Sequence, residues 1–185
     1  MSKNDTWKMN AQNAVQYVRS KLQIGASNKG LAGGAYVGSM TIAAAASSKA
    51  AIAVQSAFQK VDPRVACVSA QRSAQGFRFR QGIDYQWIKA IAAGAATSGC
   101  GNCGEQAALA FDYLLQRHIR PLDYMYRTDG DHAFVLIGRD RRTDVTRPQT
   151  WSSDVVVCDP WRGEVVDAST IVRRGWGVDS AFHMD

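Results

Sequence analysis

The sequence has few cysteines, and they do not form a disulfide-scaffold pattern. Its four cysteines are spread irregularly over 185 residues, at Cys67, Cys100, Cys103 and Cys158. A disulfide framework needs denser cysteines, so we expect reactive or buried thiols. RNA-recognition and zinc-finger spacings are also missing, and we expect no nucleic-acid partner. The net charge of +6 then indicates a solvated basic surface, or else an acidic protein partner or an anionic membrane surface.

Long apolar runs are also scarce. The stretch from Met1 to Asn10 is polar and has no apolar core of a Sec signal. We therefore expect a cytosolic protein, or one exported by a route that reads no cleavable Sec signal. Leu31 to Ser48 carries no charge, but it is mostly Ala, Gly and Ser, and Lys49 follows. This composition favours a close-packed core helix over a membrane span, and we expect no stable membrane insertion.

The order of the expected elements indicates the fold class. The chain is long enough for one domain with a full core, and it contains no internal repeat. We expect a single domain over 1–185, with a helical part at 1–98 and a central helix plus antiparallel strands at 99–185. Residue patterns predict helices at 6–22, 40–59, 63–75, after Asp84 and at 103–118, then strands at 122–127, 132–139, 154–159 and 164–167. Helices followed by strands indicate an α+β fold, in which the helical part and the central helix pack on an antiparallel sheet.

The most informative segment is Gly99-Cys100-Gly101-Asn102-Cys103-Gly104-Glu105. Asn102 is a good helix N-cap, and Glu105 at the third helical position resembles a capping box. Cys103 would then lie on the first turn, among unpaired N–H groups at the positive end of the helix dipole. That environment favours the thiolate, which is the nucleophilic form of cysteine.

Two later segments supply partners for such a thiolate. His132 opens an apolar strand, and Asp159 ends the next strand along the chain. In an antiparallel pair these two positions lie side by side, so His132 can take the thiol proton while Asp159 orients the imidazole. Trp161 could shield that hydrogen bond from water. Asp131 is a weaker rival to Asp159, because its side chain points to the other face of the strand.

These motifs carry a resemblance to a known group of enzymes. Cys103-Gly104-Glu105, His132-Ala133-Phe134-Val135 and Asp159-Pro160-Trp161 resemble the papain-like and transglutaminase-like cysteine enzymes, and most of all their compact bacterial toxin and effector branch. The likeness covers residues 99–167. It implies a papain-like or transglutaminase-like core, with Cys103 as the nucleophile and Cys100 accessory. It also implies a glutamine deamidase, a transglutaminase or a protease that acts on a protein of a target cell. Delivery as an effector or residence in the bacterial cytoplasm would both fit, as would a chaperone or immunity protein as a further partner.

One departure from the papain pattern bears on the reaction. Papain-like proteases have a glutamine six residues before the nucleophile, whereas this chain has Thr97. The oxyanion donor must then be a backbone N–H, such as that of Cys103, or a side chain such as Asn102, Gln106 or Gln149. We therefore predict acyl transfer on protein glutamine side chains, by deamidation or transamidation, with a cysteine protease as the alternative. The chemistry requires no metal and no organic cofactor.

Several charged residues outside these motifs have predicted roles of their own. Two further functions also stay open. We expect the loop residues Arg139, Arg141 and Arg142 to bind an acidic surface of the substrate. His118 is interpreted as a helix C-terminal cation and His183 as a tail residue. Cys100, Cys103, Cys158 and His132 could instead form a Cys₃His zinc site. A non-catalytic binding domain that engages partners through the Ala-rich helix is the other alternative.

Overall fold

The computed structural model describes residues 2–26 and 83–185. The helices expected at 40–59 and 63–75, the extended segment at 76–82 and the uncharged stretch from Leu31 to Ser48 lie outside the described residues. Within the described part, no helix is both long enough and apolar enough to cross a membrane.

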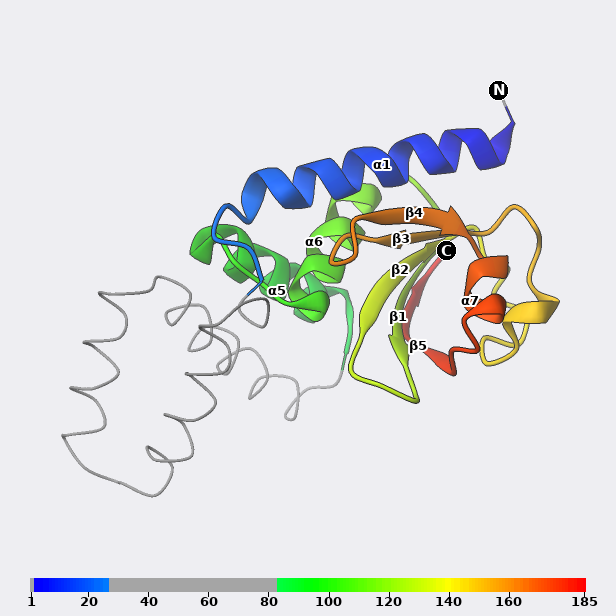
Figure 1. Cartoon of the computed structure of the whole chain (residues 1–185). Helices are drawn as coiled ribbons and strands as arrows, with labels where there is room; N and C mark the ends of the chain where they lie inside the picture. The colour runs from blue at the N-terminus through cyan, green and yellow to red at the C-terminus, as the bar shows by residue number, and fades with distance from the viewer. Residues whose placement is uncertain (1, 27–82) are drawn as a thin grey trace, which may run out of the picture.

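The described part is an α+β structure, with helices and a five-stranded antiparallel sheet (Figure 1). Three longer helices precede the sheet, and two short ones are inserted between its strands. In chain order the elements are α1 (Lys3–Lys21), α5 (Tyr85–Ser98), α6 (Cys103–Gln116), β1 (Leu122–Arg127), β2 (Ala133–Ile137), the 3₁₀ helix η1 (Pro148–Thr150), β3 (Val156–Asp159), β4 (Glu164–Asp167), α7 (Ser169–Arg173) and β5 (Val178–Met184).

The helix starts follow capping chemistry. Asp84 caps α5 by accepting a 2.7 Å hydrogen bond from the Trp87 N–H, as its position predicts. Asn102 and Glu105 form the expected capping box of α6. Helix α1 begins earlier than its apolar spacing indicates, because Ser2 forms a capping box with Asp5 and adds a polar first turn.

The sheet contains one strand more than the sequence predicted. Its order is β4-β3-β2-β1-β5, and every neighbouring pair is antiparallel. The meander from β1 to β4 agrees with the prediction. The final strand β5 returns to pair with β1, so the interpretation of His183 as a tail residue is wrong. His183 lies on β5 and is hydrogen-bonded to Asp123 of β1 at 2.8 Å.

The two faces of the sheet are covered differently. Helices α1 and α6 pack on one face, where they contact alternate strand residues such as Val135, Ile137 and Cys158. The other face packs on Trp151 and the α7 residue Ile171, through side chains such as Phe134 and Leu136. Because side chains alternate along a strand, Cys158 points toward α1, with its sulfur 3.6 Å from the Ala11 carbonyl oxygen. Its neighbour Asp159 therefore points to the opposite face.

Candidate active site

Cys103 is the first residue of α6, as expected, and it is a free thiol with a residue exposure of 9%. The loop before it is tight and depends on glycine. Gly99 ends α5 with a φ of +70°, a conformation that other residues adopt at a cost. A Cβ at Gly101 would lie 2.6 Å from the Cβ of Glu105. This loop therefore presents Cys103 in one fixed position at the helix start.

Two side chains hold the first turn of α6 in place. The Gln106 side-chain amide donates a 2.8 Å hydrogen bond to the Gly101 carbonyl. From β1, the Tyr124 hydroxyl donates a 3.0 Å hydrogen bond to the Gly104 carbonyl. One N–H of the Gln106 amide is thus bound to the loop, and the role of Gln106 as an oxyanion donor stays a prediction that rests on its second N–H. Asn102 retains a supporting role as the helix cap.

His132 and Asp159 meet as the strand pattern predicts. The His132 Nε2 and an Asp159 carboxylate oxygen are 2.6 Å apart, and Asp159 is 1% exposed. The other Asp159 oxygen accepts a 3.0 Å hydrogen bond from the Arg162 backbone N–H. The Asp159 carbonyl accepts from Gly163 at 2.8 Å, which closes the turn between β3 and β4. Asp159 is thus held from three sides, and its carboxylate can fix the orientation of the imidazole.

The thiol and the carboxylate together perturb His132. Burial lowers the pKa of the imidazole, but hydrogen bonds with Asp159 and with Cys103, together with their negative charges, outweigh it and raise that pKa to about 9. Since Nε2 is engaged by Asp159, Nδ1 is the nitrogen left for the thiol proton. The raised pKa favours the imidazolium form of His132, which is the partner that a thiolate needs.

Asp131, the rival orienting group, is not brought into the site. It lies in the exposed turn between β1 and β2, whereas the ring of His132 is bonded to Asp159. Thr97, which replaces the papain glutamine, lies exposed on α5. Gln149 is exposed on η1. Cys103 and Gly104 lie on the first turn of α6, where helix geometry gives their backbone N–H groups no intrahelical acceptor, so these two groups stay the candidate oxyanion donors.

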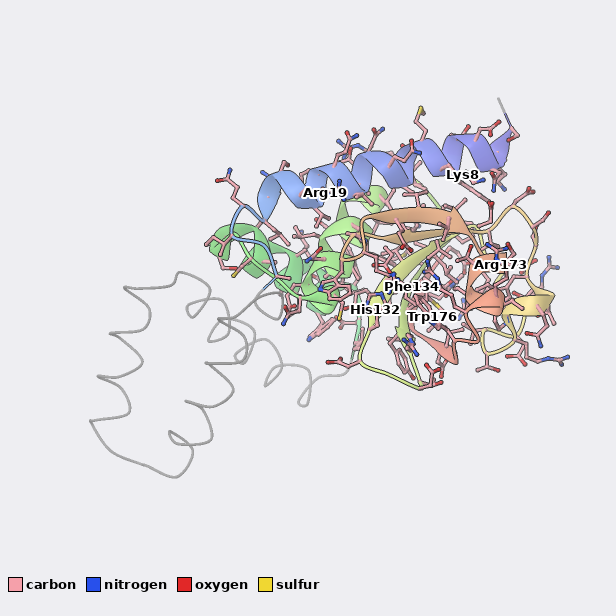
Figure 2. The ribbon with its side chains drawn as sticks, in the orientation of Figure 1. Lys8, Arg19, His132, Phe134, Arg173 and Trp176 are labelled. Carbon is pink, nitrogen blue, oxygen red and sulfur yellow. The ribbon has the colours of Figure 1, made fainter. Side chains whose placement is uncertain are left out.

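Aromatic rings surround the imidazole. The ring of Trp161 stands edge-on to His132 at 5.5 Å, in agreement with a shielding role. A second tryptophan, Trp176, stands edge-on at 5.8 Å, and Phe134 stacks at 6.1 Å. Figure 2 shows His132, Phe134 and Trp176 close together. The sequence analysis did not single out Trp176. Its position between two glycines, Gly175 and Gly177, is the signal that indicates an aromatic ring held by a loop.

The structure corrects the role assigned to Arg139. This residue is buried and forms a two-point ion pair with the buried Asp123, at 2.9 and 2.6 Å. It cannot present charge to a substrate surface. Arg141 and Arg142 are exposed, but each faces an acidic partner, Asp185 and Asp140 respectively. Exposed pairs of this kind leave little net charge to steer a ligand.

The four groups of the alternative zinc site do not converge. Cys158 is fully buried against α1, and burial raises the pKa of its thiol. Cys100 is disulfide-bonded, so the expectation of a reactive or metal-binding thiol is wrong there. Within 2–26 and 83–185, no group of three His, Cys, Asp or Glu side chains is arranged to hold a metal ion. The arrangement around Cys103 instead suits nucleophilic chemistry.

Replacing Arg139 should destabilise the protein without acting through substrate binding. Arg139→Met leaves the buried Asp123 carboxylate without its cation, which costs about 3–5 kcal/mol for a buried pair. The matched exposed variant, Arg142→Met, should leave the denaturation midpoint unchanged. Urea unfolding of both variants is the measurement. Equal midpoints for the two variants would contradict the structural role of the Asp123–Arg139 pair.

The raised pKa of His132 predicts a pH-dependent stability. Its folded-state value of about 9 lies above the ordinary 6.5, so its contribution to the free energy of unfolding is complete below pH 6.5 and is lost as the pH rises through 9. Asp159→Asn should remove most of this pH dependence, whereas the neighbouring Asp131→Asn should retain it. Urea unfolding of the three proteins, at pH values above the carboxylate range, tests this. A pH dependence unchanged by Asp159→Asn would be inconsistent with the His132–Asp159 pairing.

Comparisons with known proteins add no relative. No protein-family model, curated protein or solved structure matches this chain. What the protein does must therefore be inferred from the contacts of Cys103, His132 and Asp159.

Proposed function

We propose that this protein is a cysteine-dependent acyl-transfer enzyme that acts on glutamine side chains of a protein substrate. The observation that carries the proposal is the position of His132 between Cys103 and Asp159: its Nε2 lies 2.6 Å from an Asp159 oxygen, and both side chains raise the pKa of the imidazole. Nucleophile, base and orienting group are the parts of a thiol triad. Their positions at a helix start and at two adjacent strands support a papain-like or transglutaminase-like core.

In the first half-reaction the Cys103 thiolate attacks the carbonyl carbon of the substrate carboxamide. A carbon–sulfur bond forms, and the carbonyl oxygen takes the negative charge. Backbone N–H groups at the start of α6 can stabilise that charge. The tetrahedral intermediate then loses ammonia, whose nitrogen receives the proton that His132 carries. This leaves a thioester on Cys103 and a neutral imidazole.

In the second half-reaction the neutral His132 takes a proton from the acceptor. Water as the acceptor cleaves the thioester to a glutamate side chain and restores the thiolate–imidazolium pair. An amine as the acceptor forms an amide and completes a transamidation. Asp159 accepts a hydrogen bond from Nε2 throughout and stabilises the imidazolium each time it forms.

One observation favours a glutamine side chain over a peptide bond as the substrate. The position of the papain glutamine is occupied by Thr97, which is exposed on α5. Thr97 does not provide the oxyanion donor that a papain-like protease uses. A protease remains the alternative, since a thioester on Cys103 forms from either substrate.

Cys103 and Cys158, the free cysteines of the described part of the chain, allow an internally controlled test of the nucleophile. At about pH 6.5, iodoacetamide should modify Cys103 at least roughly tenfold faster than an ordinary thiol, since ordinary thiols are mostly protonated there. Cys158 should stay unmodified because it is buried. His132→Ala should slow the modification of Cys103 by a similar factor, and mass spectrometry of the alkylated peptides gives both rates. Alkylation of Cys103 at the rate of an ordinary thiol, unaffected by His132→Ala, would refute the proposal.

The mass change of a protein substrate identifies the acceptor. Candidate target proteins are incubated with the enzyme, and with Cys103→Ala as the inactive control, and are then analysed as intact proteins. Deamidation adds about 1 Da, transamidation adds the mass of the amine less ammonia, and proteolysis yields fragments, according to which group resolves the acyl-enzyme. We expect the deamidation or transamidation product. Fragments produced only by the wild-type protein would establish the protease alternative instead.

A further inference from the structure

Beside the proposed triad, Trp176 marks a second cluster of side chains. Trp176 lies in the connection from α7 to β5 and is only partly buried. Its ring contacts His132 at 5.8 Å and Phe134 at 5.9 Å (Figure 2). The Gly177 carbonyl accepts a 2.9 Å hydrogen bond from the Thr128 N–H, which ties this connection to the turn after β1. The hydrogen bond between Thr128 and Gly177 therefore helps to hold the Trp176 indole next to the His132 imidazole.

Three arginines from separate parts of the chain surround this one ring. Arg127 ends β1, Arg162 lies in the turn between β3 and β4, and Arg174 follows α7. Their guanidinium carbons lie 4.9, 5.7 and 5.0 Å from the centre of the Trp176 ring. The three side chains are between 27% and 38% exposed. A guanidinium next to an aromatic ring still has N–H donors at its edges, so these arginines can bind a further acceptor.

The acidic partners of this cluster do not balance its charge. Glu164 is shared, because it contacts Arg162 at 3.4 Å and Arg174 at 2.8 Å. Arg127 pairs with Asp129 at 2.9 Å. Counted without Cys103, His132 and Asp159, the three guanidinium groups face two carboxylates, so the arginine cluster itself carries one positive charge. A carboxylate is the group that would complete this cluster, since guanidinium N–H groups match its geometry.

We propose that Trp176, Arg127, Arg162 and Arg174 form a subsite for a carboxylate side chain of the protein substrate. This inference rests on the proposed attack by Cys103, because the subsite is placed relative to His132. Because Trp176 lies beside His132, the subsite would recognise an aspartate or glutamate close to the attacked glutamine in the substrate. It replaces the loop around Arg139 as the source of preference for acidic substrates.

Charged and neutral alkylating reagents test the subsite without an identified substrate. Iodoacetate carries the carboxylate and iodoacetamide does not, while both react with Cys103. The measured quantity is the ratio of the iodoacetate rate to the iodoacetamide rate. The double variant Arg162→Gln/Arg174→Gln should lower this ratio roughly three- to tenfold, as the loss of two nearby positive charges would. Glu164→Gln should raise it roughly twofold, because it frees both arginines.

Arg173→Gln is the matched control. Arg173 precedes Arg174 in the chain, but it bonds to Ser169 and Thr170 of its own helix and lies away from His132 in Figure 2. The ratio of the iodoacetate rate to the iodoacetamide rate should be the same for Arg173→Gln as for the wild type. A ratio unaffected by the double variant and by Glu164→Gln would overturn the subsite and leave the arginines a structural role. If the proposed triad itself fails, both reagents instead react slowly with the wild-type protein, so the two failures are distinguishable.

Discussion

The burial of one carboxylate, that of Asp159, constrains the whole site. A buried negative charge is costly unless hydrogen-bond donors and a cation surround it. Asp159 has the His132 ring at 2.6 Å and the Arg162 backbone N–H at 3.0 Å. The first contact joins the start of β2 to the end of β3, and the second stabilises the turn into β4. Because Cys103 also raises the pKa of His132, the imidazole links this carboxylate to the start of α6.

The sheet contains a second buried carboxylate, which has different partners and a different role. Asp123 on β1 accepts hydrogen bonds from Arg139, Ser180 and His183, and it joins β1, β5 and the loop after β2. Its partners include a permanent cation, the Arg139 guanidinium. Asp159 relies on a histidine, whose proton can leave. The two aspartates have similar burial, and the choice of arginine or histidine as partner separates a structural role from a chemical one.

The surroundings of His132 connect the proposed chemistry with recognition. Trp161 and Trp176 limit the approach of water to the His132–Asp159 bond, which strengthens that bond. Trp176 also gathers three arginines around its ring. Trp176 thus makes the surroundings of His132 less polar, and it also holds positive charge beside them. The positive charge next to the reacting group would favour an acidic substrate and a thiolate alike.

Local patterns in the sequence determined the α+β class, the α6 capping box and the strand ends that carry His132 and Asp159, because caps and alternation depend on near neighbours. The pairing of β5 with β1, the burial of Arg139 and the position of Trp176 were decided by the tertiary structure. Each depends on contacts between segments far apart in the chain, such as Asp123 with His183 or Trp176 with Arg127. The polar loop around Arg139 predicts an exposed side chain. Only the structure shows that this side chain is bound by the buried Asp123 of β1. The sequence indicated which residues could do chemistry, and only the packed sheet decided which of them face one another.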